Sequence, residues 1–179
     1  RAPVYEVMPI KSKDLKRVNL KAQAGAAIVG GDLDEGWLAV RELNKRELYA
    51  DFVEACIQRN ELDRAVMAAK EGRKHYADAR LWRLLADAHL LKDETANAGE
   101  VIATLEKWPG KDKDASNFLR LCWAALSGAK TAEFAKKLEG ASASGSFDPS
   151  RLAAKVDGSK ADGAAKSAVK KAADKMTAK

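Results

Sequence analysis

Histidine and cysteine are the side chains in this sequence best suited to metal binding or nucleophilic catalysis, and the chain has two of each. His75 and His89 lie in different parts of the chain, and neither has a cysteine or carboxylate at metal-ligand spacing, so we expect structural or surface roles. Cys56 and Cys122 each lie in an apolar, helical stretch. This pattern predicts two buried free thiols and suggests a reducing or organellar interior.

Other patterns that support catalysis are also missing. No strand pattern precedes Gly30-Gly31 and no Lys-Ser/Thr pair follows it, so we interpret it as a helix-ending turn and not as a phosphate loop. The serines cluster near residues 141–150 and lack the context of a nucleophile elbow. We therefore predict no catalytic, cofactor-binding or metal-binding residue, no cofactor and no small-molecule substrate. We also expect that the protein is not an enzyme.

The composition favours helices strongly over strands. Ala and Leu dominate the 46% hydrophobic content, there are 4 prolines, and β-branched runs of strand length are missing. No stretch approaches the roughly 20 apolar residues of a membrane span. The net charge is +6, but most of it comes from residues 151–179, which contain eight basic residues and three aspartates. The rest of the chain is nearly neutral, which weakens the case for a nucleic-acid-binding face there.

A turn sequence that returns along the chain is the most informative feature. Residues 26–39 are similar to residues 55–68, 29 positions later, and looser copies follow at 88–98 and 124–134. Each copy has the end of one helix, a short polar turn and the start of a second helix. The pattern predicts an all-α fold of about four stacked helical hairpins, an α-solenoid similar to tetratricopeptide or pentatricopeptide repeats. The alternative is an irregular helical bundle, which the shared turn makes less favourable.

Several residues are expected to shape these hairpins. Small side chains at equivalent positions of the second helices allow close helix approach, while the fourth copy has a large one; these are Gly36, Ala65, Ala98 and Phe134. Asp14 is the expected N-cap of the first helix. The expected starts of later first helices are Asn44 or a nearby residue, Asp78 and Ser116.

The four tryptophans divide into two expected classes. Trp37 and Trp123 lie among core-facing positions and are expected in the core. Trp82 follows a charged stretch and Trp108 precedes Pro109, so either is a candidate surface anchor for a partner.

The chain divides into four segments by composition. An extended arm is expected at 1–13, the repeat domain at 14–140, a linker at 141–150 and a basic Ala/Lys-rich tail at 151–179. The tail has few apolar anchors, so we expect it to be disordered or transiently helical on its own. The first residue is Arg1, which indicates a trimmed form: removal of an organellar targeting peptide and an arbitrary boundary both explain it.

The hairpins resemble the pentatricopeptide class, although a strict period is absent and no base-reading positions can be assigned. The chain also resembles the family of eighteen-kilodalton subunits that euglenozoan mitochondria add to the F1 sector of ATP synthase. The resemblance covers roughly residues 1–140, with an extended arm and degenerate hairpins, and a basic tail follows. The resemblance implies a structural subunit on the matrix side of an inner-membrane complex. It also implies docking on the outside of the F1 head against an α subunit, without nucleotide chemistry.

Two other functions remain open. One is an organellar RNA-binding protein of the pentatricopeptide type, in which the lysine-rich tail contacts phosphates. The nearly neutral body and the small number of irregular units argue against it. The other is a generic repeat adaptor that binds a peptide in its groove.

Overall fold

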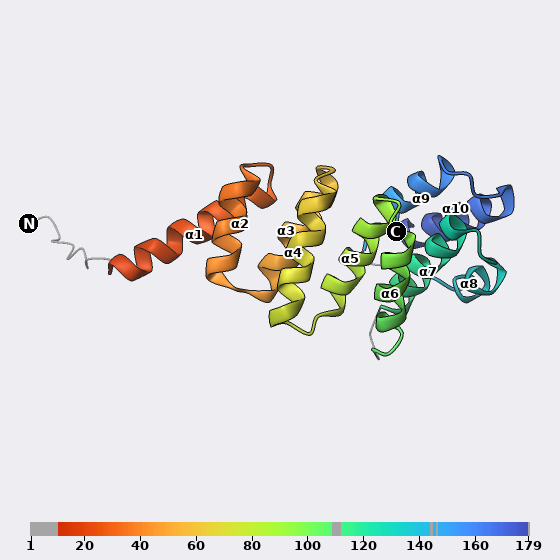
Figure 1. The fold of residues 1–179 in the computed structure, drawn as a ribbon, viewed down its shortest axis with the longest axis horizontal. Helices are drawn as coiled ribbons and strands as arrows, with labels where there is room; N and C mark the ends of the chain where they lie inside the picture. The colour runs from red at the N-terminus through yellow and green to blue at the C-terminus, as the bar shows by residue number, and fades with distance from the viewer. Residues whose placement is uncertain (1–10, 109–111, 144, 146, 179) are drawn as a thin grey trace, which may run out of the picture.

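The computed structural model describes residues 11–108, 112–143, 145 and 147–178, which form ten helices and no strand. The all-α prediction is confirmed. Successive helices pack as neighbouring pairs, and the pairs follow one another along an elongated molecule (Figure 1). The helices are α1 (Ser12–Ile28), α2 (Leu33–Leu43), α3 (Arg46–Gln58), α4 (Leu62–His75), α5 (Ala79–Leu91), α6 (Thr95–Leu105), α7 (Lys113–Ser127), α8 (Ala132–Lys137), α9 (Ser150–Asp157) and α10 (Gly163–Thr177).

The repeated turn of the sequence is a repeated turn of the backbone. One residue in each of the first four hairpins has a left-handed conformation, with φ of 113° at Gly30, 58° at Asn60, 62° at Asp93 and 74° at Gly128. The N–H of the next residue donates to a carbonyl five positions earlier, over 2.7 to 2.9 Å, in the pairs Gly31–Ala26, Glu61–Cys56, Glu94–His89 and Ala129–Ala124. Gly, Asn and Asp tolerate this conformation better than other residues. The four hairpins therefore lie where the sequence copies predict them.

Close helix approach depends on the small residues of the second helices. A Cβ atom on Gly36 of α2 would lie 2.0 Å from the Cβ of Ala27 on α1. Ala65 and Ala98 are fully buried at the corresponding positions of α4 and α6. Phe134 lies on the short helix α8 and is half-buried. The first three hairpins can therefore pack closely, whereas the fourth ends in a short helix.

A Gly36→Ala substitution is expected to lower the free energy of unfolding by about 1–3 kcal/mol, because the added methyl group overpacks the α1–α2 contact. Urea denaturation measures the change. Gly25→Ala is the matched control, since Gly25 is exposed on α1 and an added Cβ meets nothing within 4 Å. The control is expected to be neutral or stabilising by up to about 1 kcal/mol. Equal stabilities of the two variants would contradict the close approach at Gly36.

One of the first two predicted helix starts is wrong. The first helix begins at Ser12, with Lys11 at the N-cap, so Asp14 lies inside the first turn, near the positive end of the helix dipole, and not at the cap. The prediction of a start at Asn44 or a nearby residue is confirmed, because α3 begins at Arg46 with Lys45 at its N-cap. Asn44 itself is the C-cap of α2, in the left-handed conformation that asparagine tolerates.

Of the other two predicted helix starts, one is confirmed and one is wrong. The side chain of Asp78 accepts a hydrogen bond from the N–H of Arg80, so the predicted cap of α5 is confirmed. The prediction of Ser116 is wrong, because Asp112 caps α7 four residues earlier by accepting from the N–H of Ala115. Aspartate accepts this bond with a charged oxygen, which favours it over serine at the positive end of the helix.

The C-terminal segment, expected as a linker and a basic tail that does not fold on its own, forms two helices packed on the rest of the chain. Helices α9 and α10 form a fifth pair that packs on α7, with further contacts to α5 and α8. The few apolar anchors lie on the inner faces of these helices and are buried: Leu152, Val156, Val169 and Met176. Phe147, in the expected linker, packs against Phe118 with 6.0 Å between ring centroids. The existing hairpins supply the apolar surface that this segment lacks on its own.

At the other end, the expected arm at 1–13 overlaps α1, which includes residues 12 and 13. Residues 1–10 lie outside the described part of the chain. The described molecule therefore begins with α1 and ends with the α9–α10 hairpin, at opposite ends of the stack (Figure 1).

Candidate docking surface

The two thiols are buried, free and held in the protonated form. Cys56 and Cys122 lie in α3 and α7 with no disulfide between them. Burial raises the pKa of the Cys56 thiol to about 11 and raises the pKa of Cys122 well above its usual value. Because the thiolate is the reactive form, neither residue is an activated nucleophile. The prediction of buried free thiols is confirmed.

The two histidines lie in unrelated environments. His75 is exposed at the end of α4, where its Nε2 lies 3.5 Å from a carboxylate oxygen of Glu71. His89 is buried in α5, with Nδ1 3.7 Å from Glu94, and burial lowers the pKa of His89. Within the described ranges, no group of three His, Cys, Asp or Glu side chains is arranged to hold a metal ion. The structure thus brings together no constellation of these residues.

The tryptophans expected in the core are half-buried and packed against it. Trp37 stacks on Phe52 with 5.5 Å between ring centroids. Trp123 contacts the preceding hairpin through its indole N–H, which donates to the carbonyl of Thr95 at the start of α6 over 3.0 Å. Both rings thus join neighbouring helices and remain partly exposed.

The tryptophans expected at the surface contact each other. The ring centroids of Trp82 and Trp108 are 6.1 Å apart, and the guanidinium of Arg73 lies 4.6 Å above the Trp82 ring. Both are half-buried. Their role as partner anchors stays a prediction.

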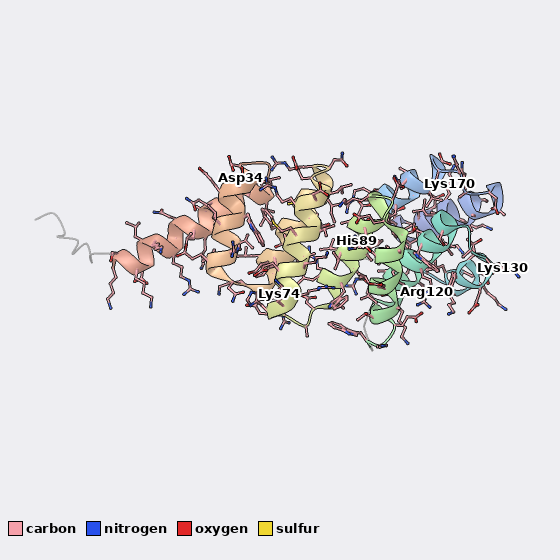
Figure 2. All side chains as sticks on the ribbon, in the orientation of Figure 1. Asp34, Lys74, His89, Arg120, Lys130 and Lys170 are labelled. Carbon is pink, nitrogen blue, oxygen red and sulfur yellow. The ribbon has the colours of Figure 1, made fainter. Side chains whose placement is uncertain are left out.

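The N-terminal half of α1 carries two neighbouring exposed apolar side chains, Leu15 and Val18. It extends beyond α2, away from the stack of hairpins (Figures 1 and 2). Leu15 and Val18 are 49% and 60% exposed there, whereas Ala24 and Ala27 in the second half of the same helix are completely buried. An exposed apolar pair at helical spacing is a typical contact for another macromolecule. We call residues 11–21 the α1 surface.

The α1 surface is also strongly basic. It carries Lys11, Lys13, Lys16, Arg17 and Lys21 against the single acidic residue Asp14. Lys16 pairs with Glu42 of α2 at 2.7 Å, which leaves an excess of positive charge around Leu15 and Val18. A partner that covers this surface therefore needs an apolar contact bordered by acidic groups.

The other large exposed apolar side chains do not form a second surface of this kind. Val29 lies in the α1–α2 turn, Leu38 on α2 and Met67 on α4. Single exposed apolar residues on separate elements are normal for a protein surface. The α1 surface is thus the best candidate docking site among the described residues.

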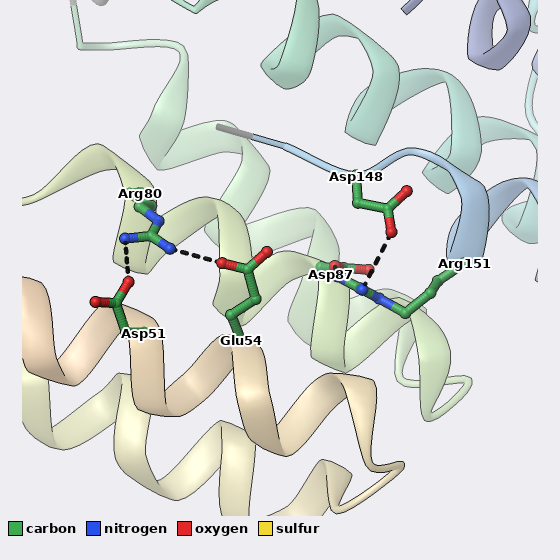
Figure 3. A network of polar contacts seen from close by, with 6 residues as sticks. All are labelled: Asp51, Glu54, Arg80, Asp87, Asp148 and Arg151. Carbon is green, nitrogen blue, oxygen red and sulfur yellow. Dashed lines mark hydrogen bonds and ion pairs between the residues drawn. The ribbon is translucent and has the colours of Figure 1, made fainter. Parts of the chain in front are cut away.

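A polar network joins α5 to two other hairpins of the molecule. Arg80 of α5 donates to Asp51 at 2.9 Å and to Glu54 at 2.6 Å, both on α3 (Figure 3). Farther along α5, the carboxylate of Asp87 is completely buried and lies 3.5 Å from the guanidinium of Arg151 on α9. The network ties α5 to the hairpin before it and to the C-terminal hairpin.

The charge on Asp87 depends on its burial. Burial, opposed by the nearby Arg151, raises the pKa of Asp87 to about 7. The folded protein therefore holds a proton on this carboxyl group over a pH range in which the unfolded chain has lost it. Above the unfolded pKa, near 4, the folded state loses relative stability until the pH passes about 7.

We expect this titration to appear in a comparison with Asp87→Asn, which cannot ionise. Relative to the variant, the wild-type free energy of unfolding should fall by about 2–3 kcal/mol between pH 5 and pH 8. Urea denaturation at several pH values measures the difference, and other titrating groups largely cancel because both proteins contain them. Parallel stability curves for the two proteins would contradict a buried, partly protonated Asp87.

Sequence reasoning missed this pair. The signal was one acidic residue inside the apolar run of residues 84–91, where a charged side chain is unusual without a partner. Its partner, Arg151, lies 64 positions later, in a segment that appeared to be a tail. Local pattern alone therefore could not connect the two.

No known protein family, curated protein or solved structure matches this chain. Among the described residues, no helix is both long and apolar enough to cross a membrane.

Proposed function

We propose that the chain is a non-catalytic structural subunit that docks on a protein partner through the α1 surface. The observation that carries the proposal is the projecting half of α1, where Leu15 and Val18 are exposed among basic side chains. The proposed setting is the mitochondrial ATP synthase, on the matrix side, with the outside of the F1 head and an α subunit as the partner. This setting is the one that the resemblance to the euglenozoan ATP synthase subunits implies.

The arrangement of α1 suits docking for energetic reasons. Its buried half is held against α2 and α3, so the exposed half is already helical and little conformational entropy is lost on binding. Burial of a Leu or Val side chain contributes roughly 1.5–3 kcal/mol when it is complete. The surrounding lysines add attraction to an acidic surface and increase the association rate.

The test is native purification of the tagged chain from mitochondria, followed by mass spectrometry of the proteins that accompany it. Co-migration of the chain with the α subunit and other F1 subunits is the expected result. Recovery with ribosomal proteins or RNA, lost after nuclease treatment, would overturn the proposal.

One observation favours RNA binding as the second candidate. Lys170 and Lys171 are exposed on α10, so the C-terminal hairpin adds a basic surface to that of α1. RNA binding predicts an affinity that falls steeply with salt concentration and that depends on these lysines. The two basic surfaces lie at opposite ends of the molecule, however, as the positions of α1 and Lys170 show (Figure 2).

A further inference from the structure

A cavity of about 310 Å³ lies between α5, α6, α7 and α8, away from the α1 surface. Its wall combines basic, apolar and aromatic side chains, which include Arg83 on α5, Ile102 and Leu105 on α6, Trp108 after α6, and Arg120 on α7. Figure 2 labels Arg120, one of the residues that line the cavity. The volume is near the lower end of small-molecule sites, which span roughly 300–1,000 Å³.

Arg83 is the unusual member of this wall. Its side chain is 9% exposed, and its Nε atom is buried without a hydrogen-bond partner among the described residues. Burial lowers the pKa of Arg83, an effect opposed by the charges of Asp112 and Asp78, but a guanidinium group remains protonated in proteins. A buried cation with an unused donor destabilises the protein unless another group completes its hydrogen bonds.

The charge balance of the wall favours an anion as that group. Four basic side chains line the cavity, namely Arg83, Lys113, Arg120 and Lys137, against the two carboxylates Glu106 and Asp112. Glu106 pairs with Arg120, and Asp112 accepts the N–H of Ala115 as the cap of α7. Both carboxylates therefore have structural contacts. Lys137 also pairs with Glu133 of α8 at 3.7 Å, so the excess of positive charge in the cavity rests on Arg83 and Lys113.

The remaining wall is suited to an apolar or aromatic group. Ile102 and Leu105 are buried side chains of α6, and the ring of Trp108 is positioned by its contact with Trp82. We propose that the cavity binds a small organic anion, with a carboxylate or phosphate on Arg83 and an aromatic or apolar part against Trp108, Ile102 and Leu105. Arginine forms paired hydrogen bonds with both kinds of anion.

Titration calorimetry of the full chain with three probes tests the proposal: benzoate, phenyl phosphate and inorganic phosphate. We expect at least one aromatic probe to bind more tightly than inorganic phosphate. The preference between benzoate and phenyl phosphate tells whether the site takes a carboxylate or a phosphate. No heat of binding from any probe at 10 mM, or equal binding of all three, would overturn the proposal.

Two variants locate the binding. Arg83→Met is expected to lower the affinity for the tighter-binding probe at least tenfold. Arg17→Met removes the same charge from an exposed position of α1 and should change the affinity for that probe less than twofold. Ser116→Leu places a larger apolar side chain in the cavity wall without removing a charge, and is also expected to weaken binding tenfold or more. If Arg83→Met does not fold, Ser116→Leu still decides the matter. Wild-type affinity in Ser116→Leu, or equal losses in Arg83→Met and Arg17→Met, would refute a site at this cavity.

Discussion

Replacement of Arg151 by Met is expected to lower the free energy of unfolding by about 1–3 kcal/mol at pH 8. The substitution removes the cation nearest to the buried carboxylate of Asp87, so Asp87 must take up a proton, which costs about 1.4 kcal/mol for each pH unit above its pKa, and the ion pair is lost as well. The loss should be smaller at pH 5, because burial raises the pKa of Asp87 to about 7 and the group can then remain neutral. Urea denaturation at both pH values measures the effect.

Two further variants separate this buried pair from an ordinary surface ion pair. Lys155→Met removes a cation from the same helix, α9. The partner of Lys155 is Asp93, at a distance of 2.9 Å, and its side chain is largely exposed. A loss of at most about 1 kcal/mol is therefore expected. Adding Asp87→Asn to Arg151→Met should restore most of the stability at pH 8, since no buried charge remains. A loss in Arg151→Met that matches the loss in Lys155→Met would contradict the role given to Asp87.

Removal of the apolar pair on α1 is expected to abolish most of the partner binding. Changing Leu15 and Val18 together to Ser removes two apolar side chains that are exposed in the free chain. Their burial in the complex contributes roughly 2–3 kcal/mol, so the complex should be thirty- to hundredfold weaker. Recovery of companion proteins with the tagged chain, quantified by mass spectrometry, measures the loss. The stability of the isolated chain should change by less than about 0.5 kcal/mol, because both side chains face solvent.

Val29→Ser is the control for this experiment. Val29 is 85% exposed at the opposite end of α1, about 16 Å along the helix from Val18, and lies outside the α1 surface. Its replacement should leave the recovery of companions unchanged. Equal recovery with the double variant and with the wild type would mean that another surface binds the partner.

The hairpin architecture could be predicted because its information is local. Gly30, Asn60, Asp93 and Gly128 each sit in a short polar segment between apolar helical patterns, and each takes the left-handed conformation that ends a helix. The close approach at Gly36 follows from the same alignment of copies. Turn chemistry and the helical period together were sufficient for this part of the fold.

The rest depends on contacts between distant segments. The Ala- and Lys-rich C-terminus has too few apolar residues to fold alone, and its helices α9 and α10 are buried against α7 instead. Asp87 and Arg151 meet only after that docking. The cavity beside Arg83 likewise forms where four helices come together. None of these features has a signal in the local sequence that specifies its partner.

Cross-linking mass spectrometry of the assembly purified with the tagged chain tests the docking proposal most directly. The α1 surface carries Lys11, Lys13, Lys16 and Lys21, which react with amine-specific cross-linkers. The proposed function predicts cross-links from these lysines to an α subunit of the F1 head. An assembly without ATP synthase subunits, or cross-links to the α subunit confined to α9 and α10, would contradict docking through α1.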